Sequence, residues 1–208
     1  MSFVEALGIS KGITAIIGSG GKTSLLYALA EELQDSVILC TTTQIFPPEH
    51  IPVVQRVQQV QGIVCVGTPC PNGKLGTPQQ TIDQLAEIAD FVLVEADGSK
   101  HLPLKAHASY EPVIPENCTQ VILVVGASGL NRPIGETVHR SEIFYALTGS
   151  EIATPDAVAV ALQKEHYGNR VFINQADAAP EEAQTLAKLL PSPVCVGSVK
   201  EGEILCLY

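Results

Sequence analysis

The stretch ITAIIGSGGKTSLL, residues 13–26, joins an apolar run to a helical pattern through a turn rich in glycine. Glycine allows backbone N–H groups to turn inward around an anion, and the start of a helix adds the positive end of its dipole. A strand, a glycine turn and a helix that begins at Lys22 are typical of phosphate-binding loops. The sequence therefore predicts an α/β fold with a nucleotide phosphate site at the end of this strand.

The loop is of a compact type. Its first glycine stands four residues before the lysine, so the pattern is G-x-x-G-K-T rather than the longer G-x-x-x-x-G-K-[ST]. This compact form resembles the loops of the Mur ligases and of the lipid A 4′-kinase. We expect Lys22 to reach the terminal phosphates as a catalytic cation, and Thr23 to bind Mg²⁺ through its hydroxyl. The other expected contacts to the nucleotide come from Gly18, Ser19, Gly20, Gly21 and Ser24.

Apolar residues recur in short continuous runs, with helical patterns between them. Continuous runs rich in β-branched residues are typical of strands covered on both faces. Their alternation with helices predicts a three-layer, P-loop NTPase-like α/β fold, with a mostly parallel central sheet and helices on both faces. The last two runs are too close for a helical crossover and predict a hairpin. Strands are expected at 13–18, 36–40, 62–67, 91–95, 120–126, 170–174, 193–197 and 203–208, and helices at 22–33, 81–89, 142–147, 156–164 and 181–190.

Length and composition narrow the class of protein. A chain of 208 residues is expected to form a single domain over residues 1–208. Hydrophobic residues make up 46% and charged residues 16%, which excludes a disordered chain, and the net charge of −10 argues against a nucleic-acid partner. No apolar run is long enough for a membrane span, and the first residues lack a signal-peptide pattern, so a cytoplasmic protein is expected. The six cysteines form no CxxC pair and are expected to be incidental thiols.

Two carboxylates follow the apolar run FVLVE (91–95), in the segment Glu95-Ala96-Asp97-Gly98. A phosphate loop needs an acidic partner for its metal, and an unpaired charge at the end of a buried strand is costly. As an ExxG element, the segment resembles the metal site of the nickel metallochaperone GTPases, with Glu95 near Mg²⁺ and the Gly98 amide near the terminal phosphate. Asp97 is the competing metal ligand and catalytic carboxylate. A metal that bridges Thr23 and Glu95 requires the strand with Glu95 to lie parallel to the strand ending at Gly18 and directly beside it.

The run RVFIN (170–174) continues into Asn174-Gln175-Ala176-Asp177. GTPases read guanine with N-K-x-D at the end of a late parallel strand, where the aspartate accepts hydrogen bonds from guanine N1–H and the 2-amino group. Adenine would leave that carboxylate without these donors. Asp177 would read the base and Asn174 would orient the loop, with Gln175 in the place of the lysine. The alternative is an ordinary Asn/Asp turn after a strand.

Further candidate residues lie near the expected ends of the strands. Lys100, His101, Lys105 and His107 follow the presumed metal site and would bind an anion or belong to a solvated loop. The threonines at 41–43 would contact the metal or a substrate, or form an ordinary turn, since α/β sheets bind ligands at this edge. His139 and Arg140 lie where a helix is expected to begin, and the start of a helix is the unfavourable end of the dipole for cations. The alternative is that Ser141 caps this helix and leaves both residues outside it.

Several of these segments together resemble one family, the YqeC-type accessory proteins associated with selenium-dependent molybdenum hydroxylases. The segments are GSGGKTSLL (18–26), CTTTQIF (40–46), VEADGSKHLPLKAHASYEPVIP (94–115), VHR (138–140) and INQAD (173–177). The resemblance covers nearly the whole chain, and the block at 94–115 is its most specific part.

The resemblance implies a role in maturing a selenium or molybdenum cofactor centre, with a molybdenum hydroxylase or its maturation machinery as partner. Together with the motifs, it predicts a factor that binds GTP (or ATP) with Mg²⁺ and hydrolyses it slowly. The expected nucleotide ligands then include Gly98, Lys100, Asn174 and Asp177 besides the phosphate loop. The alternative is a kinase or ligase that uses ATP or GTP to act on a small molecule, which the compact loop favours.

Overall fold

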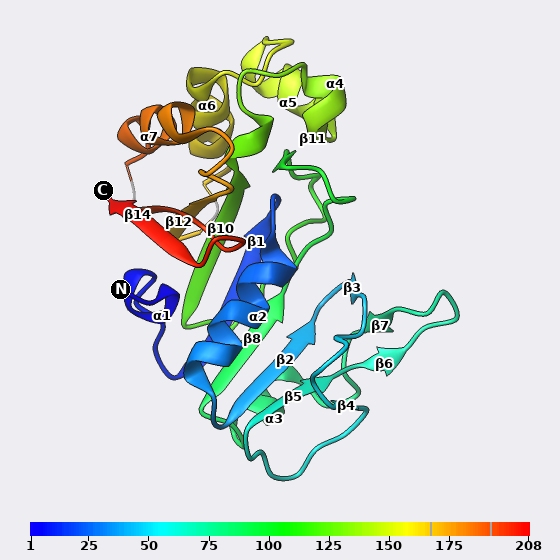
Figure 1. The fold of residues 1–208 in the computed structure, drawn as a ribbon. Coiled ribbons are helices and arrows are strands. Elements are labelled where there is room, and N and C mark those ends of the chain that lie inside the picture. Colours follow the sequence, from blue (N-terminus) through cyan, green and yellow to red (C-terminus); the bar gives the residue numbers. More distant parts are fainter. Residues whose placement is uncertain (167, 192) are drawn as a thin grey trace.

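The computed structural model describes residues 1–166, 168–191 and 193–208. Within these ranges nine strands form one central sheet in the order β14-β13-β12-β10-β1-β8-β2-β5-β4 (Figure 1). Neighbouring strands are parallel except for β13 and β14, which form an antiparallel terminal pair. The predicted α/β class, the mostly parallel sheet and the C-terminal hairpin are therefore confirmed. The strands are β1 (Gly12–Gly18), β2 (Val37–Thr41), β4 (Val53–Val54), β5 (Ile63–Val66), β8 (Phe91–Glu95), β10 (Gln120–Gly126), β12 (Arg170–Asn174), β13 (Val194–Ser198) and β14 (Glu203–Leu207).

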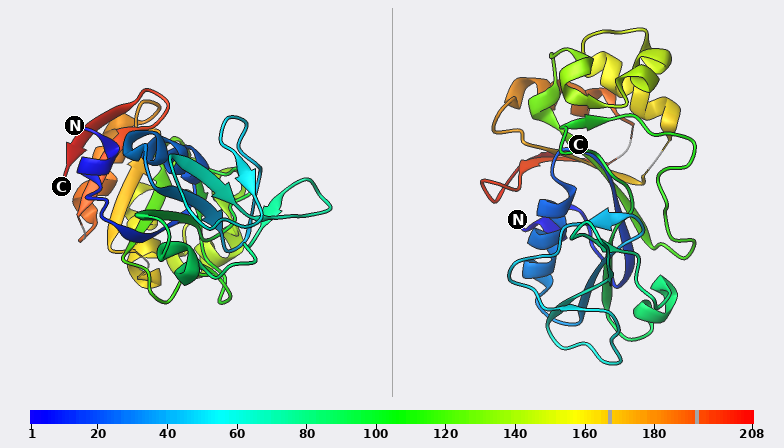
Figure 2. Two further views of the ribbon diagram at one scale, coloured as in Figure 1. Left: turned by 90° about the horizontal axis from the view of Figure 1, so that it is seen from below. Right: turned by 90° about the vertical axis from the view of Figure 1, so that its right-hand side faces the viewer.

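Helices cover both faces of this sheet and make it the middle layer of three (Figures 1 and 2). Side chains of β1 alternate between the two faces: Ile16 packs with one group of helices, and Ile13 and Ile17 pack with the other. The first group is α1 (Phe3–Ala6) and α2 (Lys22–Leu33). The second includes α3 (Ile82–Ala86), α5 (Ser141–Thr148), α6 (Pro155–Glu165) and α7 (Pro180–Leu189), and the 3₁₀ turn η1 (Ala127–Gly129) and α4 (Ile134–Thr137) also contribute to it.

The position of β1 is what assembles the site. It lies between β8 and β10, and it is parallel to both. Ile16 of β1 is aligned with Glu95 of β8, and Glu95 is in turn aligned with Thr41 of β2. The prediction that the strand with Glu95 lies directly beside the strand ending at Gly18 is therefore confirmed.

The structure also contains short elements that the sequence patterns did not predict. A three-stranded sheet of β3 (Gln44–Ile45), β7 (Leu75–Gly76) and β6 (Thr68–Pro69) projects beyond the end of β2. A second small pair joins β9 (Leu104–Lys105) to β11 (Val138–His139). Two proline-rich segments, residues 69–78 and 103–115, therefore carry two-residue strands, which are too short to show a period of two.

The ends of the predicted helices shift by a few residues at most. Thr154 caps α6 by accepting a hydrogen bond from the N–H of Ala157, and Pro155 occupies its first turn. Ser141 is the first helical residue of α5 rather than its cap, and Arg140, with a left-handed backbone, takes the cap position. The interpretation that Ser141 caps this helix is therefore wrong, although His139 and Arg140 do precede its first residue.

In the part of the chain that the structure describes, the model contains no helix with the length and apolar character needed to cross a membrane. The six cysteines are all free thiols. Burial raises the pKa of Cys65 to about 11, which keeps that thiol protonated near neutral pH.

Candidate functional site

The glycine turn between β1 and α2 wraps around an open hollow of about 700 Å³ at the carboxyl ends of the strands. Gly18, Gly20 and Gly21 all have positive φ, at 91°, 85° and 115°. A side chain on Gly20 would place its Cβ 2.4 Å from the backbone of Gly126, so no larger residue fits at that position. Both the loop conformation and its close approach to the neighbouring strand therefore require glycine.

Backbone N–H groups of this turn are open to a ligand. Within the described residues, none of the five amides of residues 20–24 donates a hydrogen bond to a backbone or side-chain acceptor. The residues that carry these amides line the hollow. Amides at a helix start that lack an internal partner are the groups that bind phosphate oxygens, and the helix dipole adds to the attraction.

Lys22 lies across the base of the hollow and is 3% exposed. Its Nζ donates to the carbonyl oxygen of Gly18 at 2.9 Å and to Ser99 Oγ at 3.1 Å, and it lies 3.2 Å from Asp97 Oδ1 and 3.8 Å from Glu95 Oε1. The ammonium group is thus held at the phosphate loop by groups from two strands.

Thr23 and Glu95 meet at the edge of the hollow. The hydroxyl of Thr23 donates to Glu95 Oε2 at 2.7 Å, and both residues line the hollow. Burial raises the pKa of Glu95, and the charge of Lys22 and the hydrogen bond from Thr23 offset this only in part. A hydroxyl and a carboxylate side by side are ligands that suit Mg²⁺, which is commonly held by one or two protein oxygens together with phosphates. Within the described residues, no group of three or more His, Cys, Asp or Glu side chains could hold a metal by itself.

Asp97 occupies a different place from Glu95. Its side chain is fully buried behind the phosphate loop and does not line the hollow. Its Oδ2 accepts hydrogen bonds from the Gly18 N–H at 2.8 Å, from Lys105 Nζ at 3.0 Å and from His107 Nε2 at 2.9 Å. Burial alone would favour the neutral acid, but the hydrogen bond from His107 and the charges of Lys22 and Lys105 lower the pKa of Asp97 to about 2. The geometry therefore favours Glu95 as the metal ligand and gives Asp97 the task of fixing the loop.

Lys105 and His107 are both buried and paired with carboxylates of this cluster. Lys105 Nζ lies 2.6 Å from Glu111 Oε2 as well as contacting Asp97. His107 Nδ1 lies 2.8 Å from Glu165 Oε2 of α6, and the hydrogen bonds to Asp97 and Glu165 raise the pKa of His107 against the effect of burial. The expectation that these two residues bind a phosphate or lie in a solvated loop is wrong. Lys100 and His101, from the same segment, do line the hollow.

The segment Asn174–Asp177 lines a second hollow of about 600 Å³, which shares Gly21, Ser24 and Gln175 with the first. Asn174 is 4% exposed and ties three loops together: its Nδ2 donates to the carbonyl of Gly20 at 2.8 Å, and its Oδ1 accepts from the Val199 N–H at 2.9 Å. Asp177 is exposed and lines this second hollow. The arrangement fits a base beside the phosphate loop, with Asn174 as the residue that orients the two loops.

The remaining candidates have local partners. Thr41 Oγ1 donates to the carbonyl of Glu95 at 2.7 Å and Thr42 Oγ1 to that of Val113 at 2.8 Å, whereas Thr43 lines the first hollow. Arg140 pairs with Glu111 at 2.5 Å, and His139 lines the hollow. Thr41 thus joins the ends of β2 and β8, and Thr42 joins the residue after β2 to the segment after β8.

Some residues at the site were not predicted. Phe46 and Lys74 line the first hollow, from the small sheet that projects past β2, and Ser99 binds Lys22. Ser128 and Lys200 line the second hollow. Phe46 ends the segment CTTTQIF (40–46) of the family resemblance, which was the one signal for it. Lys74 belongs to no such segment, and a turn between two-residue strands carries it to the site. Lys200 follows β13, so its place at the sheet edge was the one signal available.

The chain is similar in sequence to known proteins of one family. A family model described as "YqeC protein" matches residues 14–142, which hold the phosphate loop, Glu95 and Asp97 but not Asn174 or Asp177. "Uncharacterized protein YqeC" of Escherichia coli (strain K12) is 39% identical over an alignment of 163 residues, and the match covers 70% of this chain. The match covers 62% of the length of that relative. No solved structure matches the chain.

Proposed function

The chain belongs to the YqeC family, and we propose that it is a nucleotide-binding accessory protein that binds GTP with Mg²⁺ at the strand-end site and hydrolyses it slowly. The observation that carries this proposal is the row of open amides at residues 20–24, with Lys22 beside it. Such a row recognises an anion without any side-chain contact, and a lysine at its centre suits two adjacent phosphates.

Each residue of the phosphate site has a role in this proposal. The amides from Gly20 to Ser24 hold the β- and γ-phosphate oxygens, and Lys22 moves from its acidic partners to the same oxygens. Thr23 and Glu95 would hold Mg²⁺, which supplies positive charge where negative charge builds up on the γ-phosphate. Gly98 lines the hollow three residues after Glu95, and its amide would meet the terminal phosphate there.

The base would lie in the second hollow, between Asp177 and the loop after β13. Asp177 offers two acceptor oxygens to guanine N1–H and its 2-amino group, which supports GTP over ATP. The partner that we propose is a molybdenum hydroxylase or its maturation machinery, on the strength of the family resemblance. ATP in place of GTP remains the alternative if Asp177 makes no contact with the base.

A second candidate function is a kinase or ligase that uses the nucleotide to act on a small molecule. The size of the first hollow favours it, because about 700 Å³ is a volume typical of a whole small-molecule site. One experiment separates the candidates: the affinities of ATP, GTP and xanthosine triphosphate, each with and without Mg²⁺, followed by assays of hydrolysis and of phosphate transfer. Slow hydrolysis without an acceptor supports the accessory factor, and equal weak binding of all three nucleotides contradicts the nucleotide site.

Replacing Glu95 with glutamine is expected to lower the affinity for Mg²⁺, measured in the presence of GTP, by about 10- to 100-fold. The amide retains the hydrogen bond to Thr23 but lacks the charge that draws the metal. Titration of Mg²⁺ at fixed GTP, read by calorimetry, measures the effect. Glu116→Gln is the control, because Glu116 is exposed and away from the hollow. An unchanged Mg²⁺ titration in Glu95→Gln would exclude Glu95 as a metal ligand.

Replacing Asp177 with asparagine is expected to weaken GTP and to strengthen xanthosine triphosphate. Xanthine has an oxygen where guanine has its amino group, and the new amide can donate to that oxygen. The loss of two charge-assisted hydrogen bonds costs roughly 2–4 kcal/mol, or about 30- to 1000-fold in affinity for GTP. Competition binding with both nucleotides measures the switch, with Glu181→Gln as an exposed control nearby on α7. If both affinities stay as in the native protein, the segment at 174–177 is only a turn.

A further inference from the structure

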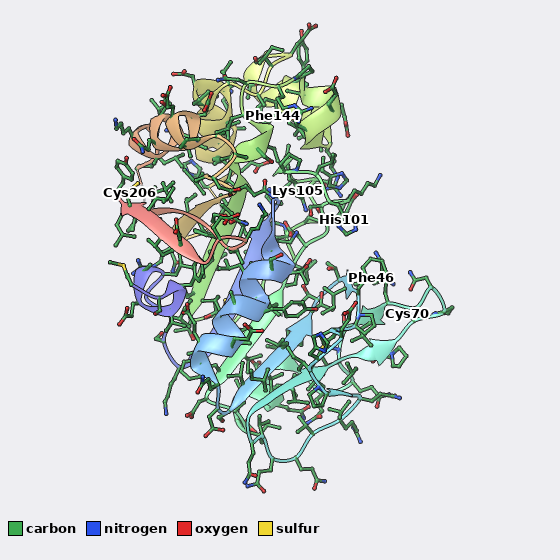
Figure 3. All side chains as sticks on the ribbon, viewed as in Figure 1. Phe46, Cys70, His101, Lys105, Phe144 and Cys206 are labelled. Atoms are coloured by element: carbon green, nitrogen blue, oxygen red, sulfur yellow. The ribbon has the colours of Figure 1, made fainter. Side chains whose placement is uncertain are left out.

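The first hollow extends well beyond the phosphate loop. Its outer wall is made by Phe46, Lys74, Lys100, His101 and His139, none of which contacts the turn at residues 18–24 through a hydrogen bond among the described residues. In Figure 3, Phe46 and His101 lie near one another on the same side of the molecule, Phe46 beside the small sheet and His101 on the segment after β8. The residues with roles in the proposed function lie on the inner wall. Lys100, which the sequence predicted as a nucleotide ligand, lies instead on the outer wall, and this wall needs another explanation.

Two rings form the centre of this outer wall. The rings of Phe46 and His101 are stacked, with centroids 6.3 Å apart and an angle of 24° between their planes. They come from segments more than fifty residues apart in the chain, and Phe46 is still 54% exposed. Lys100 and His101 are both held in the left-handed region, at φ 51° and 61°, which is costly for residues other than glycine. An exposed aromatic side chain beside a second ring offers apolar surface against which a flat ring packs.

Positive charge gathers around these rings. Lys74 Nζ lies 4.8 Å from the centroid of the Phe46 ring, and Lys100 lines the same wall. The chain as a whole carries a charge of −10, with only 12 lysines and arginines. The two carboxylates that line the hollow are already paired with cations: Glu111 with Lys105 and Arg140, and Glu95 with Lys22. The outer wall is therefore a positively charged surface that suits an anion, on a chain whose net charge is negative.

We infer that the outer part of the hollow binds a second small molecule beside the nucleotide, a phosphomonoester that carries a flat ring. Lys74 and Lys100 would contact the phosphate, because two ammonium groups suit a compact dianion. The ring would stack on Phe46 and His101. The inference rests on the proposed function in one respect, namely that the nucleotide phosphates occupy the inner wall.

Phenyl phosphate is a suitable probe, with methyl phosphate as the matched compound that lacks the ring. Binding to the full chain is measured by calorimetry and by ³¹P NMR, with and without saturating Mg–GDP. We expect phenyl phosphate to bind in both conditions, and more tightly than methyl phosphate. Lys74→Ala and Phe46→Ala should each weaken it by about tenfold or more. Lys188→Ala, at an exposed position on α7, should leave it unchanged.

The outcomes separate this inference from the proposed function. Lys22→Ala should remove GDP binding yet retain phenyl phosphate, since Lys22 belongs to the inner wall. If GDP displaces phenyl phosphate and Lys22→Ala abolishes its binding, the probe occupies the phosphate loop and the inference is overturned. If GDP fails to bind the native protein, the proposed function fails, and the effect of Lys74→Ala and Phe46→Ala still decides the outer site. Equal affinity for phenyl phosphate and methyl phosphate would overturn the part played by the rings.

Discussion

Replacing Lys22 with alanine is expected to weaken the binding of Mg–GTP by more than about 100-fold. In the proposed complex Lys22 contacts oxygens of both the β- and the γ-phosphate. Each hydrogen bond to a charged group contributes about 1.5–3 kcal/mol, so the loss of two corresponds to roughly 3–6 kcal/mol. Calorimetry with GTP, GDP and guanosine measures the effect, which should be largest for GTP and absent for guanosine.

The fold should survive this substitution, which is what makes the experiment informative. Asp97 loses the ammonium group at 3.2 Å but retains Lys105, His107 and the Gly18 amide. Lys22→Gln is a useful second variant, since its amide can still donate to the Gly18 carbonyl and to Ser99 without a charge. Circular dichroism and a melting curve check that the fold is intact. A folded Lys22→Ala protein with the GTP affinity of the native chain would refute the phosphate site.

The features that could be predicted from the sequence are those formed by residues that are neighbours in the chain. The glycine turn between β1 and α2 is a strand, three glycines and a helix start within one short stretch, and each part has a local signal. The place of Glu95 followed from a constraint on geometry, because a metal shared with Thr23 requires β8 beside β1. The helix at Phe3–Ala6 was missed although its capping box, Ser2 with Glu5, is a sequence signal.

The features that escaped prediction depend on residues far apart in the chain. Lys105 and His107 look like loop cations in sequence, and only the fold brings Asp97 and Glu165 to them. Phe46 and Lys74 reach the hollow through strands of two residues, which leave no pattern of alternation. Asp97 illustrates the difference: its position in the sequence predicted a metal ligand, whereas the fold buries its carboxylate among three hydrogen-bond donors.

Replacing Asp97 with asparagine is expected to destabilise the fold by about 3–5 kcal/mol, because it leaves buried cations without their partner. Oδ2 accepts from the Gly18 N–H, from Lys105 and from His107, and the whole carboxylate is buried. An asparagine at this position retains one acceptor oxygen and turns two N–H donors toward groups that are themselves donors. Urea unfolding followed by circular dichroism measures the loss in the free energy of unfolding.

The matched control is Asp90→Asn. Asp90 pairs with Lys11 at 2.8 Å, but the two side chains are 48% and 71% exposed. Exposed pairs contribute about 0–1 kcal/mol, so this variant should unfold almost as the native protein does. Equal stability of the Asp97→Asn and Asp90→Asn variants would show that the cluster behind the phosphate loop contributes little to the fold.

The dependence of stability on pH gives this prediction a second readout. The pKa of Asp97 is lowered from 3.8 to about 2, so its contribution, roughly 2 kcal/mol, is present above pH 3.8 and is lost as the pH falls toward 2. The pKa of His107 is raised above 6.5, so its contribution is complete below pH 6.5 and is lost as the pH rises through the pKa of the folded state. The native protein should therefore gain most from the cluster between about pH 4 and 6.5. In the Asp97→Asn variant, the loss of stability as the pH falls toward 2 should disappear. The loss of stability above pH 6.5 should become smaller, because only Glu165 then stabilises the protonated form of His107. If the stability of the variant follows the same pH curve as the native protein, displaced by a constant amount, the coupling between Asp97 and His107 is refuted.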